Sequence, residues 1–303
     1  MENKFTIQYL QQAEIDQAKW DECIDRAGNG LVYAYSMYLD HMADNWDALV
    51  LNDYEMVMPL PWRRKFGIHY LYQPFLVAQL GLFGNGITPG ILEKFLQAIP
   101  RKFRLWEFPL NHGNLFSVSG FDLYERSNFI LPLKKSHEEI SSSYRENLRR
   151  NLRKSVQYGS FASEVRINEV TEIVKEFNCV EQTKELDRFT SLYLQLEEKN
   201  MAACHGIYSK NNELLASAAF LFSHRRAYYL LVGNHPNGRT LGASHALLDH
   251  FIRMNAGKDL VLDFEGSDIR NLAFFYSSFG AQEEKYTAIK RNHLPWYMRW
   301  LKK

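Results

Sequence analysis

The segment GRTLGASHALLDHFI, residues 238–252, has the composition of an anion-binding turn. It follows an apolar run and opens a second run whose apolar side chains recur every three or four positions, as on one face of a helix. Gly238 and Gly242 allow a tight turn, so amide N–H groups at the start of the helix can point at a pyrophosphate. Such a turn is also common without any ligand. The candidate cradle comprises Arg239, Thr240, Leu241, Gly242, Ala243 and Ser244.

A second candidate is the strongly basic stretch at residues 137–159, which is helical by composition and ends at a glycine. Apolar residues recur every four positions from Ile140 to Val156, and this spacing predicts a helix that docks on the body of the protein. The cationic side chains are Arg145, Arg149, Arg150, Arg153 and Lys154. They either form a solvated face or bind a phosphate-rich ligand through Arg149, Arg150 and Arg153.

Glu265 and Ser267 follow an apolar run at residues 260–264 that is interrupted only by Asp263. The run predicts a buried strand, and ligands of open α/β sheets bind beyond the carboxyl ends of strands. Glu265 is therefore a candidate general base, although an ordinary solvated carboxylate fits equally well. Ser267 either caps the following helix or contacts a ligand.

A third cluster, HYLYQPFLVAQLGLFG at residues 69–84, places polar side chains among apolar ones. Tyr72, Gln73 and Gln79 could orient a polar acceptor substrate in a pocket. The alternative is that these residues belong to strands of the core.

Composition and motifs exclude several other classes of function. The 303 residues are 46% hydrophobic, which predicts a folded protein, and 36 basic against 35 acidic residues leave no broad polyanion-binding surface. The three cysteines form no CxxC pair and the histidines have no metal-binding spacing, so we expect neither disulfides nor a metal. Hydrolase-elbow and P-loop motifs are missing. Without an apolar run long enough to span a membrane or a leader-like start, we expect a cytoplasmic protein with no membrane span.

The elements that position these residues occur in the same order twice. Residues 46–51 and 56–62 flank a turn, a third strand follows at 68–73, then a helix near 91–99 and a strand at 103–108. Residues 203–208, 214–222, 228–232, 247–252 and 260–264 repeat that order. The repeat predicts two similar halves, residues 1–135 and 136–303, each a mostly antiparallel mixed α/β sheet flanked by helices. A chance recurrence is the alternative.

Arg239-Thr240-Leu241-Gly242-Ala243 resembles the Q/R-x-x-G-x-G/A loop with which GNAT-superfamily acyltransferases hold the pyrophosphate of coenzyme A, with Ser244 at the last position. The sequence of residues 136–303 also resembles the C-terminal part of FemABX-like peptidyltransferases. The matching segments are the D-F-x-G-S pattern at 263–267, the F-x-x-x-F-G pattern at 275–280 and the basic helix at 145–159. Tyr276 precedes Gly280 by four residues, as does the tyrosine that acts as general acid in many GNAT enzymes.

The resemblance implies a double GNAT fold and N-acyl transfer to a small-molecule or peptide amine, most simply from an acyl-CoA. Glu265 would then be the base, and Tyr276 either the acid or a core residue. Aminoacyl transfer from a charged tRNA to a cell-wall precursor is a second possibility, although the chain has no spare length for the helical arm of many tRNA-dependent members. A non-catalytic module that binds a ligand or a partner is a third. The oligomeric state stays open.

Overall fold

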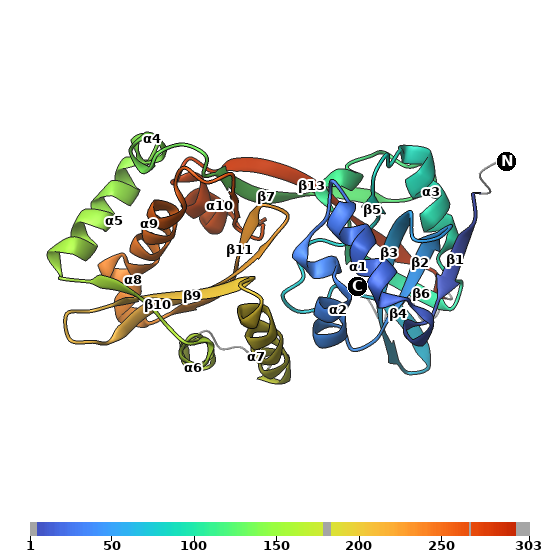
Figure 1. The fold of residues 1–303 in the computed structure, drawn as a ribbon, viewed down its shortest axis with the longest axis horizontal. Helices are drawn as coiled ribbons and strands as arrows, with labels where there is room; N and C mark the ends of the chain where they lie inside the picture. Colours follow the sequence, from blue (N-terminus) through green and yellow to red (C-terminus); the bar gives the residue numbers. More distant parts are fainter. Residues whose placement is uncertain (1–4, 178–182, 267, 295–303) are drawn as a thin grey trace. The chain divides into compact units, whose positions relative to one another are not determined.

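The computed structural model describes residues 5–177, 183–266 and 268–294. The chain divides into two compact units: Met1–Arg126 together with Lys285–Lys303, and Ser127–Glu284. Figure 1 shows the chain coloured from blue at its start to red at its end. Within the described residues, no helix is both long enough and apolar enough to cross a membrane.

The first unit is a mixed sheet with helices. Its strand order is β1-β2-β3-β4-β6-β13, with β5 paired to β3, and β4 with β6 is a parallel pair. Buried side chains of α3, including Phe95 and Leu96, join the core on this sheet. The elements are β1 (Ile7–Leu10), α1 (Gln17–Arg26), α2 (Ser36–Met42), β2 (Trp46–Leu51), β3 (Met56–Lys65), β4 (Ile68–Leu71), β5 (Phe83–Gly84), α3 (Pro89–Ala98), β6 (Phe103–Pro109), the start of β7 (Leu123–Pro132) and the larger part of β13 (Gln282–Asn292).

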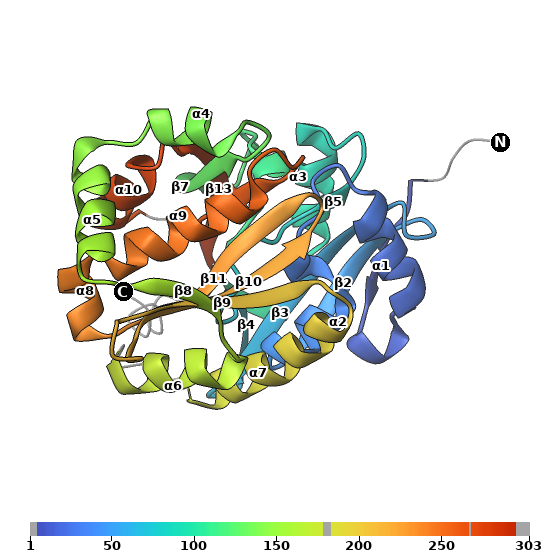
Figure 2. The same ribbon diagram turned by 60° about the vertical axis from the view of Figure 1, so that its left-hand side comes forward.

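The second unit has the strand order β7-β12-β11-β10-β9-β8, with β11 and β12 parallel. Helices α6 and α7 lie on one face of this sheet and α9 on the other, with α5 packed beside α9 (Figures 1 and 2). Its elements are α4 (His137–Ser142), α5 (Glu146–Gln157), β8 (Phe161–Glu164), α6 (Ile167–Phe177), α7 (Thr183–Glu198), β9 (Ala202–Tyr208), β10 (Leu214–Ser223), β11 (Arg226–Asn234), α8 (Pro236–Leu241), α9 (Ala243–Asn255), β12 (Val261–Asp263) and α10 (Arg270–Ser277).

The pairing pattern is the same in the two units, and the predicted mixed α/β fold class is confirmed. Each unit has three strands in antiparallel succession, β2-β3-β4 in the first and β9-β10-β11 in the second. In each, a helix then precedes a strand that pairs in parallel with the third of these strands: β6 with β4, and β12 with β11. Leu247, Leu248, Phe251 and Ile252 on α9 are all 0% exposed, so the apolar face expected from their spacing is the buried face.

Two details differ from the sequence prediction. The basic stretch is two helices, α4 and α5, and the expected docking stripe is buried at Ile140 and Leu148 but ends in solvent, where Val156 is 76% exposed. The boundaries between the units fall at 126/127 and 284/285, whereas we expected one boundary after residue 135. Residues beyond 284 belong to the first unit because Ala288 to Asn292 of β13 pair with β6.

Candidate active site

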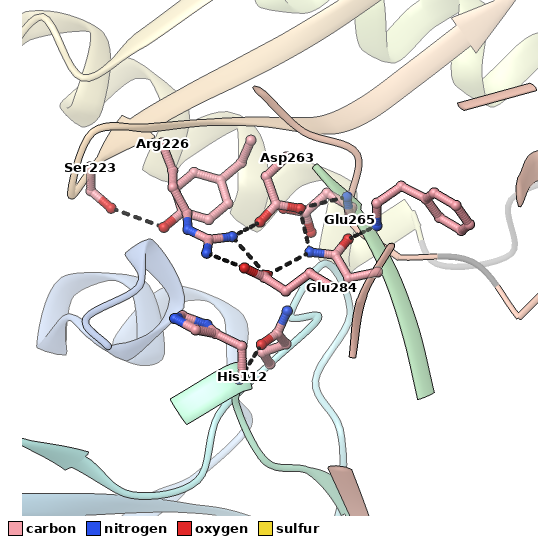
Figure 3. Close-up of polar contacts among 10 residues, drawn as sticks. His112, Ser223, Arg226, Asp263, Glu265 and Glu284 are labelled. Carbon is pink, nitrogen blue, oxygen red and sulfur yellow. Dashed lines mark hydrogen bonds and ion pairs between the residues drawn. The ribbon is translucent and has the colours of Figure 1, made fainter. Parts of the chain in front are cut away.

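The second unit contains a buried cluster of charged side chains (Figure 3). They come from the start of β11, the end of β12 and the start of β13. Arg226 donates to Asp263 Oδ2 at 2.8 Å and to the two carboxylate oxygens of Glu284 at 2.6 and 2.9 Å. Asn128 Nδ2 donates to Asp263 Oδ1 at 3.0 Å and to Glu284 Oε2 at 3.3 Å. Burial alone would lower the pKa of Arg226, but the two carboxylates raise it above its usual value. The Arg226 guanidinium thus bridges the two carboxylates.

Asp263 also fixes the backbone that carries Glu265. Its Oδ1 accepts a hydrogen bond from the backbone N–H of Glu265 at 2.9 Å. Glu265 has φ +68° and Gly266 has φ +80°, so the chain passes through two consecutive left-handed residues. For a residue with a side chain this conformation costs about 1–2 kcal/mol, and such strain is concentrated at functional sites. Glu265 is therefore held on a strained turn at the carboxyl end of β12.

Tyr276 on α10 lies in the electrostatic field of this turn. Its ring stacks on Phe264 with centroids 4.7 Å apart, and its side chain is 7% exposed. Burial, followed by the charges of Glu265 and Asp263, raises the pKa of Tyr276. The charge of the predicted base thus acts on the predicted acid, and the raised pKa keeps Tyr276 protonated at neutral pH, as a general acid must be. Ser267 lies outside the described residues.

The predicted pyrophosphate loop has a different structure. His235 caps a short helix, α8, with Pro236 at its first position, and Gly242 (φ +73°) links α8 directly to α9. A Cβ at Gly238 would lie 2.1 Å from Leu215 O, and one at Gly242 would lie 2.7 Å from Asn151 O. These glycines thus permit close packing against β10 and α5, in addition to the tight turn expected from the sequence.

The other cradle residues are distributed around this junction. Arg239 and Thr240 are exposed, Leu241 is half-buried and Ala243 is buried. Ser244 donates its hydroxyl to Asn234 Oδ1, at the end of β11. Whether these residues bind coenzyme A stays a prediction.

A groove of about 970 Å³ runs between α5, β8 and α9, and we call it the α5 groove. Its apolar lining includes Leu152, Val156, Ala162, Ile207 and Ala246. Its charged lining comprises Arg150, Arg153, Lys154, Arg253 and Asp249. Ser160 Oγ, also in the lining, is buried and has no hydrogen-bond partner among the described residues. An apolar floor with excess positive charge suits an amphipathic anion.

The three predicted arginines have different environments. Arg149 donates to Ser142 O at 2.7 Å, at the end of α4, and is not part of the groove lining. Arg153 pairs with Glu146 across the exposed face of α5. Arg150 lines the groove without an ion-pair partner among the described residues. Of the three, Arg150 is therefore the most available to an anion.

In the first unit, two of the three predicted acceptor residues lie together. Tyr72 and Gln73 line a pocket of about 240 Å³ with Glu107, Tyr124 and Arg126. Gln79 is 2% exposed and its Oε1 accepts from the backbone N–H of His112 at 2.8 Å, so its position is structural. Among the described residues, no group of three or more His, Cys, Asp or Glu side chains could hold a metal ion.

Three members of the charge cluster were not predicted from the sequence: Arg226, Asn128 and Glu284. The one available signal was Asp263, an acidic residue in an otherwise apolar run. A buried carboxylate requires a partner, but the side-chain partners of Asp263 come from two other strands, 37 residues away in sequence for Arg226 and 135 for Asn128. Sequence spacing could not identify them.

Comparison with known proteins gives a fold but no sequence relative. No protein-family profile and no curated protein matches the sequence. The crystal structure of FemX superimposes with a TM-score of 0.66 at 13% identity, over 93% of this chain and 97% of that chain. L-PGS from Bacillus licheniformis gives 0.58 at 11%, over 94% and 95%, and a conserved protein of unknown function from Bacteroides thetaiotaomicron gives 0.58 at 15%, over 95% and 99%. The chain has a GNAT-like fold of the FemX type, as the resemblance implied.

Proposed function

We propose that this chain is an N-acyltransferase in which Glu265 removes a proton from the acceptor amine and Tyr276 protonates the leaving group. The strained turn at the end of β12 carries the proposal, because it holds Glu265 where its charge acts on Tyr276. The FemX-type fold supports the same class of reaction.

The donor in this proposal is an acyl-CoA whose phosphates bind in the α5 groove. Arg150, Lys154 and Arg253 provide the charge, and the apolar floor accommodates the pantetheine arm. In the strand order, β8 lies four places from β12, a separation of about 19 Å at ~4.8 Å per strand. The donor must therefore extend across the unit, with its phosphates at the groove and its thioester near Glu265.

The catalytic part is tested with Glu265→Gln. Acetyl transfer from acetyl-CoA to a panel of amines and peptides is followed by mass spectrometry. A positioned general base contributes about 10² to 10⁴ in rate, so kcat falls by that factor while acetyl-CoA affinity stays unchanged. The matched control is Glu198→Gln, an exposed carboxylate at the end of α7 in the same unit. Activity within about threefold of the parent would remove Glu265 from the mechanism.

The donor part is tested separately by calorimetry with coenzyme A. Arg150→Gln weakens binding about tenfold, equivalent to about 1.4 kcal/mol, because it removes a phosphate contact. Arg225→Gln, which removes an exposed charge at the β10–β11 turn, is the control and leaves affinity unchanged. If coenzyme A does not bind, or if both variants bind equally well, the α5 groove is not its site.

A charged tRNA is the second candidate donor. The cationic side chains of α5 extend beyond the groove to Arg149, and Arg145 immediately precedes the helix, so the basic surface is longer than one coenzyme A molecule requires. Titration with unfractionated aminoacyl-tRNA at increasing salt tests it. Arg150→Gln and Lys154→Gln each remove a cation that would neutralise an RNA phosphate, so each variant lowers the salt slope of binding. Tight, salt-sensitive tRNA binding without coenzyme A binding would select this donor.

A further inference from the structure

The first unit contains a pocket of about 490 Å³ that the proposed acyl transfer does not use. It is formed by the end of α3, the first residues of β6, the loop before β7 and the end of β13. Its volume lies within the range of about 300–1,000 Å³ that is typical of small-molecule sites. The pocket therefore has the size for a ligand of its own.

Strand register collects its polar groups on one face of the sheet. Arg291 of β13 is directly opposite Trp106 of β6, and the backbone N–H of His293 donates to Arg104 O at 2.8 Å. Residues opposite each other in an antiparallel pair, and residues two apart in a strand, share a face. Arg104, Trp106, Arg291 and His293 thus form one surface, and Arg101 joins them from the turn between α3 and β6.

The positive charge of this surface has no acidic counterpart. No Asp or Glu lines the pocket. Arg101, Arg104 and Arg291 have no ion-pair partner among the described residues. Burial lowers the pKa of His293, and the charges of Arg291 and Arg104 lower it further. Three arginines converging on a pocket favour a phosphate group, which they can bind in bidentate fashion.

The pocket also contains aromatic faces. The rings of Trp106 and Phe121 are nearly parallel, at 17° with centroids 6.3 Å apart. The Arg291 guanidinium lies 4.6 Å from the Phe121 centroid and 5.3 Å from that of Trp106. Stacking on two rings orders Arg291 while leaving its N–H groups available in the ring plane. Aromatic rings and stacked guanidinium groups are the surfaces on which nucleobases stack.

We infer that this pocket binds a nucleoside 5′-phosphate, with the phosphate at Arg101 and Arg104 and the base against Phe121 and Arg291. The pocket combines unpaired arginines with aromatic rings, so neither a phosphate alone nor a nucleoside alone would use both. A free phosphate would make no use of Phe121 or of the stacked Arg291 guanidinium, and an uncharged nucleoside would leave the arginines without an anion. The site lies in the first unit and is independent of the acyl-transfer proposal.

Calorimetry on the full chain tests the inference with adenosine 5′-monophosphate, uridine 5′-monophosphate, ribose 5-phosphate, adenosine and inorganic phosphate. At least one nucleotide binds ten or more times tighter than ribose 5-phosphate, adenosine or phosphate. Arg104→Gln weakens nucleotide binding at least tenfold. Phe121→Leu weakens nucleotide binding while leaving ribose 5-phosphate affinity unchanged.

The matched control is Lys290→Gln, which removes one positive charge from the neighbouring position of β13, outside the pocket lining. It changes nucleotide affinity by less than twofold, and circular dichroism confirms that each variant is folded. Three outcomes overturn the inference: no nucleotide binds, phosphate or ribose 5-phosphate binds as tightly as the nucleotides, or Lys290→Gln weakens binding as much as Arg104→Gln.

Discussion

Glu265 has a backbone conformation that favours glycine, yet the position carries a carboxylate. With φ +68°, a glycine here would relieve about 1 kcal/mol of strain. We predict that Glu265→Gly is as stable as the parent or more stable in urea unfolding, while kcat for acyl transfer falls by about 10² or more. A variant that is destabilised and still active would show that Glu265 is a structural residue.

His245 on α9 makes the free energy of unfolding depend on pH. It contacts Phe275 with centroids 4.8 Å apart, and burial lowers its pKa to about 4 from the usual 6.5. The native state therefore disfavours the protonated ring. The contribution of the neutral ring to the free energy of unfolding is fully present above pH 6.5. It is lost as the pH falls towards 4, by at most about 3 kcal/mol.

We predict that His245→Asn has a lower free energy of unfolding at pH 7 but a flatter dependence on pH. Between pH 7 and pH 4 the parent loses about 2–3 kcal/mol more than the variant, measured by urea unfolding at each pH. Other titrating groups are common to both proteins, so their difference isolates His245. Parallel curves for the two proteins would contradict the assignment.

At the scale of elements, the α8–α9 junction depends on Gly242 for two reasons. Its φ of +73° disfavours any side chain, and a Cβ would lie 2.7 Å from Asn151 O on α5. Gly257 isolates the first effect, because it has φ +82° and nothing within 4 Å of an added Cβ. We predict that Gly257→Ala costs about 1 kcal/mol and Gly242→Ala at least about 2 kcal/mol in chemical denaturation. Equal losses would mean that α5 moves away without cost.

This junction also explains what the sequence could and could not predict. Periodic apolar residues determine β2, β3, α3, β9, β10 and α9, so these elements and their repeated order could be predicted. Pro236, Asn237 and Gly238 are turn residues, and the sequence favoured a loop there. A helix forms instead because Pro236 suits a first helical position and Gly238 allows contact with Leu215.

The candidate site was predicted only in part, for a related reason. Glu265 and Tyr276 follow local patterns that the sequence displays, and the structure places them near each other. Arg226 and Glu284 stand in no recognisable motif, and only tertiary pairing reveals that they form a cluster with Asp263. The sequence predicted the positive charge of the α5 groove but not the cavity, because its lining comes from α5, β8, β9 and α9, which only the tertiary fold brings together.

At the scale of the whole molecule, the last strand belongs to both units. Up to Glu284 it contributes to the charge cluster of the second unit, and from Lys285 it belongs to the first. There Ile289 is 0% exposed, the Leu110 N–H donates to Thr287 O at 2.8 Å, and Thr287 Oγ1 donates to Asn114 O at 3.1 Å. The first unit is therefore discontinuous in sequence, and a cut at residue 135 separates it from one of its strands.

We predict that the fragment 1–135 lacks cooperative thermal unfolding, whereas residues 1–126 joined to 285–303 by a short glycine-serine linker unfold cooperatively. Without residues 285–294 the fragment loses the strand that pairs with β6, exposes the apolar surface covered by Ile289, and leaves an unpaired edge that favours aggregation. Circular dichroism melting and analytical ultracentrifugation measure the two properties. The control is the same joined chain, residues 1–126 linked to 285–303, carrying Ile289→Asp. It has the same length but buries a charge in the core, and it therefore fails to restore folding. If fragment 1–135 melts cooperatively at the temperature of the joined chain, β13 is dispensable to the first unit and the boundary after residue 135 is the physical one.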